Sequence, residues 1–456
     1  MHTTTIPFLS VLLFLLTLSL GATAADKLVG IRDAETENTI RAMTMPLFQA
    51  AGMAPNAFRL FLLNDREMNA FVTNGLDLVI NSGLILKTEN TNQFAGILAH
   101  EVGHIVGGHL IGRLEELEAE WLKSLLVTAA GAAISIAGGR GDIGVGVILA
   151  GQEIGYRNLL RFTRAQEATA DQAAVRLLEA TRQSAQGLVD FFGIMDNNQA
   201  MRLAPQHDPY LRTHPPNRER ITFLRHHVET SAYATVPPNP VIEQRYQRVR
   251  AKLFAFLESP ARTLARYKTV DESLPARYAR AIALYKKADL SQALPFIEAL
   301  VAEQPEDPYF LEMKGQMLFE NGRLAEAATT YRQAVSLLPE NALLHTALGQ
   351  ILIEIEEGTK FLDEAMAHLA MAAKQEPDNA FPWRLLSIVY GRQGNTAMTA
   401  YAMAEYAFLT GRYGEARHHA TRAIQLLPKD SPKALRAQDI KVQIERRVDR
   451  QRRTVP

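Results

Sequence analysis

The sequence of 456 residues contains no cysteine. Disulfides, thiolate catalysis and a lipid-anchored cysteine are therefore excluded, and any bound metal must be held by histidine and carboxylate. Neither sign of charge is in excess, because Lys+Arg and Asp+Glu number 49 each, which argues against nucleic acid as the main partner. The hydrophobic fraction of 47% is ample for buried cores, and the length suggests two or three domains.

Long hydrophobic runs are also lacking. The apolar run 6–20 is too short to span a bilayer comfortably, and Ala22-x-Ala24 behind it fits a signal-peptidase site. We therefore expect residues 1–24 to be a cleaved secretory signal and the mature chain to be periplasmic. The segment before the run has no Lys or Arg, so an uncleaved membrane anchor is the alternative.

Two further apolar runs, 124–137 and 143–150, are rich in small residues and are separated by a glycine-rich break. Neither approaches the ~20 residues of a spanning helix. One interpretation is a buried helical hairpin with close helix contacts. The other is a hairpin that makes peripheral contact with a membrane or an apolar client.

The motif His100-Glu101-Val102-Gly103-His104 lies in the helix-patterned run 92–113. Helical residues four apart share a face, so both imidazoles can bind one metal while Glu101 reaches the water on it. Zinc in such sites takes three protein ligands and a water whose pKa falls to about 7. The motif thus predicts a zinc peptidase with one Zn²⁺ per chain, His100 and His104 as ligands, and Glu101 as general base.

The third ligand is sought among the other acids and histidines. Glu167 and Asp171 are four apart in the helix-patterned stretch 156–180, so they share one face. We predict that Glu167 binds the metal and that Asp171 accepts the free N–H of a ligand histidine. His109 is one residue short of the third-histidine position of long-motif zincins, and we expect it to face solvent. Glu153 has no downstream carboxylate on the same face.

His214 directly precedes Pro215, which disfavours helical backbone, so the imidazole is expected on a stiff, extended loop. Its catalytic interpretations are a donor to the developing oxyanion and a displaceable fourth zinc ligand that keeps the enzyme latent. A purely structural loop histidine is the third interpretation.

Strand-like runs at 58–63, 69–72 and 76–80 precede the zinc motif, and the Asn74-Gly75 pair between the last two is a hairpin signal. We expect a small antiparallel sheet packed on the metal-binding helix. An open sheet edge near a metal can hold an extended substrate through backbone pairing.

The C-terminal half repeats. Pro305 and Pro339 are 34 positions apart, the tetratricopeptide period, and the pattern continues to Pro377 after a four-residue insertion. We count about four repeats, whose concave face would normally bind a partner. The fold is therefore expected to be mainly α, with a small antiparallel sheet in a zincin-type domain followed by an α-solenoid. The expected divisions are the signal at 1–24, a zinc metalloprotease domain at 25–230, a linker and connecting helix at 231–267, and repeats at 268–456.

The order of hairpin, zinc motif, apolar hairpin, Glu167-x-x-x-Asp171 and Thr213-His214-Pro215-Pro216 resembles the HtpX and CAAX-prenyl-protease family of gluzincins. Membrane members of that family carry transmembrane helices between the zinc motifs. The corresponding runs are short here, which points to the soluble, exported branch.

With the repeats added, the chain resembles the periplasmic branch that acts in outer-membrane protein quality control. The resemblance implies a protease with chaperone-like activity, unfolded or misassembled outer-membrane proteins as substrates, and contact with the β-barrel assembly machinery through the repeats. It also implies that His214 is a switchable fourth zinc ligand. The alternative function is a mainly non-proteolytic chaperone or scaffold that acts through the repeats.

Overall fold

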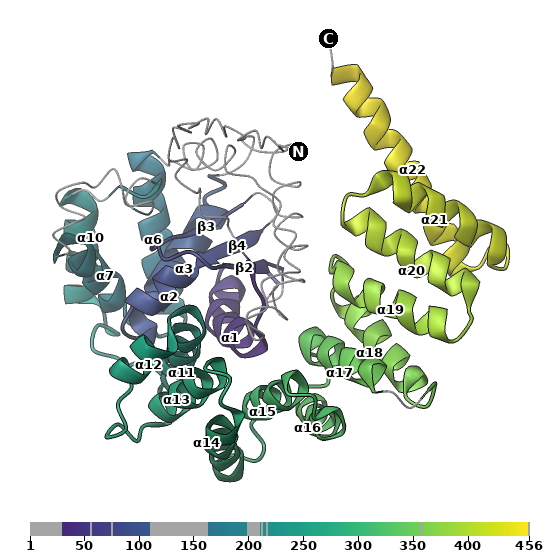
Figure 1. Ribbon diagram of the computed structural model, residues 1–456. Helices are drawn as coiled ribbons and strands as arrows, with labels where there is room; N and C mark the ends of the chain where they lie inside the picture. The colour runs from purple at the N-terminus through teal and green to yellow at the C-terminus, as the bar shows by residue number, and fades with distance from the viewer. Residues whose placement is uncertain are drawn as a thin grey trace, which may run out of the picture.

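The computed structural model describes residues 30–54, 57–73, 76–109, 163–197, 210, 213–215, 218–355 and 358–454. The predicted signal, both apolar runs between 124 and 150, and Glu153 lie outside these ranges. Among the helices that the structure describes, none has the length and apolar character needed to cross a membrane. Figure 1 shows a sheet-containing part and an arc of helices that curves away from it to the C-terminus.

The first part contains a four-stranded sheet and its surrounding helices. Its elements are β1 (Gly30–Ile31), α1 (Ala34–Ala50), β2 (Arg59–Leu63), β3 (Ala70–Val72), β4 (Asp77–Asn81), α2 (Ser82–Lys87), α3 (Thr91–Val106), α6 (Arg164–Ala180), α7 (Gln186–Asn197) and α10 (Arg218–Thr230). Apolar residues of the strands pack with Leu47 and Phe48 of α1 and with Phe94 and Ile97 of α3 in one core. The sheet therefore supports the helix that carries the zinc motif.

The strand order is β1-β2-β4-β3. The predicted hairpin is confirmed, since β3 and β4 pair antiparallel and the N–H of Thr73 donates to the carbonyl of Asp77. The sheet is mixed rather than purely antiparallel, because β2 and β4 pair in parallel from Arg59 opposite Asp77 to Leu63 opposite Asn81. After β2 the chain crosses to the far side of the position of β4 before β3 begins. The second strand of the hairpin, β4, therefore lies next to β2, and β3 lies at the edge of the sheet.

Two helices and a solenoid follow. The predicted connecting helix is two helices, because Ser259 caps a new helix that starts at Pro260. The elements are α11 (Pro240–Leu257), α12 (Pro260–Arg266), α13 (Leu274–Lys286), α14 (Leu290–Glu303), α15 (Pro308–Glu320), α16 (Leu324–Leu337), α17 (Ala342–Glu354), α18 (Leu362–Gln375), α19 (Ala380–Arg392), α20 (Thr396–Leu409), α21 (Tyr413–Leu426) and α22 (Pro432–Thr454).

Helices α13 to α18 pack as three consecutive pairs, and beyond them α20 packs on both α19 and α21, with α22 against α21. The unit around Trp383, whose sequence departs from the repeat pattern, forms the helix α19, which packs on α20. The predicted insertion lies between α17 and α18, where seven residues, 355–361, replace the three, 321–323, between α15 and α16. Gly315 is required inside α15, since a Cβ there would lie 2.6 Å from the Tyr331 ring.

Buried ion pairs join the first part to the solenoid. Arg248 of α11 pairs with Glu35 of α1, and its Nη1 lies 2.6 Å from Asp307 Oδ2 at the start of α15. Lys252 of α11 lies 3.8 Å from Glu312 of α15. Removal of Arg248 would take the cation away from the buried Glu35 and from Asp307, so its contacts hold the two parts in one arrangement.

Glu312 gives this interface a pH dependence. Burial raises its pKa to about 8, against the attraction of Lys252. The folded pKa exceeds the unfolded value, so between about pH 4.5 and pH 8 the unfolded chain binds fewer protons, and stability falls as pH rises. We expect Glu312→Gln to raise the free energy of unfolding near pH 9, by on the order of a few kcal/mol, and to change it little near pH 5. Chemical denaturation at both pH values measures this.

The matched control is Glu306→Gln, which alters an exposed acid of the same region. An identical pH dependence in wild type and Glu312→Gln would contradict the role of Glu312.

Candidate metal centre

Helix α3 presents the zinc motif from a firmly capped and buried position. Asn90 is its N-cap, and the Asn90 side chain accepts from the N–H of Gln93 at 3.0 Å. The Gln93 side chain in turn accepts from the N–H of Glu89 at 2.7 Å. Because every residue of α3 from Phe94 to His104 is buried, the orientation of the helix is fixed by packing.

Helix α6 brings the second half of the centre. It begins at Arg164 behind a Thr163–Gln166 capping box, so the first turn is well defined and Glu167 lies in it. The two helices approach closely at Gly103, where a Cβ would lie 2.5 Å from the carbonyl oxygen of Ala170. Glycine inside the zinc motif therefore allows α6 to place Glu167 against the two motif histidines.

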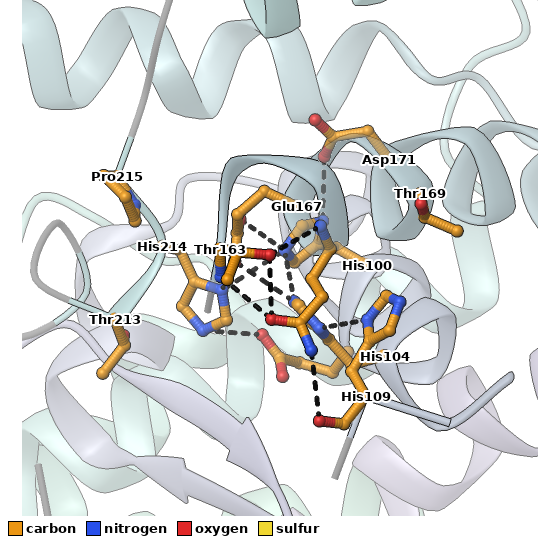
Figure 2. Close-up of polar contacts among 12 residues, drawn as sticks. His100, His104, His109, Thr163, Glu167, Thr169, Asp171, Thr213, His214 and Pro215 are labelled. Atoms are coloured by element: carbon orange, nitrogen blue, oxygen red, sulfur yellow. Dashed lines mark hydrogen bonds and ion pairs between the residues drawn. The ribbon is translucent and has the colours of Figure 1, made fainter. Parts of the chain in front are cut away.

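Four buried side chains converge (Figure 2): His100, His104, Glu167 and His214. Nε2 of His104 lies 3.1 Å from Nε2 of His100, and Nδ1 of His214 lies 3.3 Å from the same atom. The Glu167 carboxylate lies 3.4 Å from His100 Nε2 and 3.5 Å from His104 Nε2. Ligands of a tetrahedral zinc lie about 3.3 Å from one another, so the spacing of these atoms fits one ion.

His214 lies at a bend and not on an extended loop, because its N–H donates to the carbonyl of Tyr210 at 2.7 Å. Its Nδ1 is 3.0 Å from Glu167 Oε1, and its Nε2 is 3.5 Å from Glu101 Oε1. The Tyr210 ring packs on the imidazole with centroids 4.7 Å apart. The His214 ring thus lies between the Glu167 and Glu101 carboxylates.

Behind these residues lies a second layer of polar contacts. Asp171 Oδ1 is 2.9 Å from His100 Nδ1, the nitrogen that faces away from the cluster. Arg220 of α10 donates from Nε to Asp171 at 2.6 Å, and its Nη1 lies 2.7 Å from Glu167. Burial raises the pKa of Asp171, but the hydrogen bonds from His100 and Arg220 outweigh it and leave this pKa lowered. The carboxylate is therefore held ionised.

Glu101 is fully buried, and neither of its carboxylate oxygens has a hydrogen-bond partner among the described residues. Burial raises its pKa, although His214 and His100 oppose this. An unsatisfied buried carboxylate is costly unless a water or an ion completes the site. The donor set is three imidazoles and a carboxylate, with two further buried acids, which fits a divalent cation of the zinc type.

Sequence reasoning missed two features of this centre. His109 is half-buried, and its expected solvent-facing role overlooked that its Nδ1 lies 2.9 Å from His104 Nδ1 (Figure 2). No role was predicted for Arg220. Two buried acids four apart on one helix, Glu167 and Asp171, nevertheless require a buried cation nearby. That requirement, applied to the arginines after His214, would have pointed to Arg218 or Arg220.

A buried His-Glu-x-x-His helix beside a buried glutamate defines the class of protein as a metalloprotease. Residues 34–228 match Peptidase family M48, and residues 278–342 match Tetratricopeptide repeat. The chain carries a family M48 metalloprotease domain followed by tetratricopeptide repeats. This confirms the predicted fold class and the predicted enzyme class.

Similar proteins share most of this organisation. The chain is 24% identical to the β-barrel assembly-enhancing protease of Yersinia pestis over 87% of its own length and 79% of the relative. It is 23% identical to the protein of that name from Escherichia coli K12, over 85% and 78% of the two chains. Metalloprotease YcaL of Escherichia coli K12 is 29% identical over 38% of this chain and 61% of that protein.

Proposed function

We propose that this protein is a zinc-dependent endopeptidase of the periplasm that cleaves unfolded or misassembled outer-membrane proteins. The observation that carries this proposal is the buried cluster of His100, His104, Glu167 and His214 beside the unsatisfied carboxylate of Glu101. The periplasmic location rests on the predicted signal at 1–24. The client class is supported by the names of the similar proteases, which refer to β-barrel assembly.

His100, His104 and Glu167 hold the zinc in this proposal. A zinc bound there supplies Lewis-acid polarisation of the peptide carbonyl and of water. Glu101 accepts the proton of the attacking water and returns it to the leaving amine, a role that its raised pKa and buried position support. Asp171 fixes the tautomer of His100, and Arg220 holds Asp171 in place.

His214 makes the resting enzyme latent. Catalytic zinc sites keep one position open, whereas here a fourth protein donor, Nδ1 of His214, lies 3.3 Å from His100 Nε2 and 3.0 Å from Glu167 Oε1. We infer that His214 fills the position that water must take, and that its departure activates the protease. The packing of the His214 imidazole on Tyr210 gives it a defined resting position.

The repeats serve as the partner-binding part in this proposal and contact the β-barrel assembly machinery. Their attachment to the protease domain through the Arg248–Asp307 pair would couple partner binding to the first part of the chain. Latency at rest also favours a second candidate, a mainly non-proteolytic chaperone. Restoration of envelope integrity by Glu101→Gln, in cells that lack the protein, would support this second candidate.

The test uses the purified full chain with zinc and an unfolded outer-membrane β-barrel protein. We expect slow cleavage that a chelator abolishes and that His214→Ala accelerates. If His214 occupied the metal in 90% of molecules, its removal would raise the rate by about tenfold. His226→Ala, which alters an exposed histidine of α10, is the matched control.

If His214→Ala cleaves more slowly than wild type, His214 stabilises the developing oxyanion instead. Zinc-independent cleavage, or none by either form, would contradict the proposed peptidase.

A further inference from the structure

We propose that His109 is a positioning residue: it accepts the hydrogen bond from Nδ1–H of His104 and thereby keeps Nε2 of His104 directed at the metal. The inference rests on the proposed metal site. It concerns a residue outside the predicted ligand set, for which the zinc motif itself gives no role.

The tautomer of His104 requires such an acceptor. A neutral imidazole carries one proton, and the nitrogen that binds a metal cannot carry it. Nε2 of His104 faces His100 and Glu167 at 3.1 and 3.5 Å, so the proton belongs on Nδ1. Nδ1 of His109 lies 2.9 Å from this nitrogen and can accept its proton in a hydrogen bond.

The arrangement parallels that of the first motif histidine. His100 directs Nε2 at the cluster and Nδ1 at Asp171, 2.9 Å away. The groups that accept from ligand histidines fix ring orientation and raise ligand basicity. Asp171, from α6, thus accepts the hydrogen bond from Nδ1–H of His100. His109, from the turn that ends α3, accepts the corresponding bond from His104.

The backbone at the end of α3 turns back and places His109 beside His104. Gly108 has φ +64°, the left-handed conformation that glycine favours at a helix end. The N–H of His109 then donates to the carbonyl of His104 at 3.2 Å. The chain reversal brings the imidazole back beside the helix that precedes it.

Gly107 leaves the space that the returning ring needs. A Cβ at this position would lie 2.4 Å from Nε2 of His109. From the other side, the Gln166 side chain of α6 donates to the His109 carbonyl at 3.4 Å. Backbone, neighbouring helix and glycine therefore all hold this ring at His104.

Zinc affinity of the metal-stripped full chain, measured against a chelating dye, tests the inference. We expect His109→Ala to weaken zinc binding about 10–100-fold, as is typical when an outer partner of a ligand is lost. Gly107→Ala should weaken it comparably, because it displaces the ring while His109 stays intact. His109→Asn should bind nearly as wild type, since the amide oxygen can take the place of Nδ1.

Matched controls are His226→Ala and Gly193→Ala; a Cβ on Gly193 meets nothing within 4 Å. Wild-type affinity in both His109→Ala and Gly107→Ala would overturn the inference. A merely structural role would also overturn it. In that case His109→Asn would bind zinc as weakly as His109→Ala, and metal-free His109→Ala would unfold at a lower temperature than metal-free wild type. If the wild type does not bind zinc, the proposed metal site is contradicted, and this inference with it. If the wild type binds zinc and the variants bind it equally well, only the inference is contradicted.

Discussion

Glu101→Gln is expected to lower the cleavage rate of an unfolded client about 10²–10⁴-fold, the usual contribution of a general base. Glutamine keeps the shape of the side chain but cannot accept the proton of the attacking water. The Glu101 carboxylate is fully buried, and burial raises its pKa towards the pH at which a base works best. Single-turnover cleavage measures the loss.

Zinc content separates this effect from damage to the site. Because Glu101 is not a ligand, Glu101→Gln should retain one zinc per chain. Glu306→Gln, an exposed substitution of the same chemistry, should cleave as wild type. Undiminished cleavage by a zinc-loaded Glu101→Gln enzyme would contradict its assignment as the base.

Glu167→Gln is expected to release the metal. The carboxylate lies 3.4 and 3.5 Å from the two motif histidines, and it supplies the negative charge of the ligand set. Its loss should weaken zinc binding by more than about 100-fold, the upper end for residues that act only through a ligand. Metal analysis after dialysis gives the zinc retained per chain.

Asp171→Asn is the comparison for Glu167→Gln. Asp171 contacts His100 only through the nitrogen that faces away from the cluster, so we expect a smaller loss, about 10–100-fold. Equal losses in both variants, or a full zinc complement in Glu167→Gln, would contradict the predicted ligand set.

The helical parts of the centre could be predicted from the sequence because their information is local. Positions four apart share a face, which placed His100 with His104 and Glu167 with Asp171 before any packing was known. The fold class and the repeats followed from equally local patterns.

Features that depend on a change of chain direction could not be predicted in that way. The helical pattern was extended through His109, whereas the helix ends at Val106 and Gly108 reverses the chain. The pairing of β2 with β4 depends on which of the two hairpin strands lies next to β2. The alternation of apolar and polar residues along a strand shows which face is buried but does not identify the neighbouring strand. Arg220 reaches Asp171 from a helix 49 residues later in the chain.

The central claim is that one resting metal site joins His100, His104, Glu167 and His214. X-ray absorption at the zinc edge of the resting protein, compared with His214→Ala, tests it most directly. We predict three imidazole nitrogens and one carboxylate in the wild type, and one imidazole fewer in the variant. Two imidazoles in both proteins would contradict the claim.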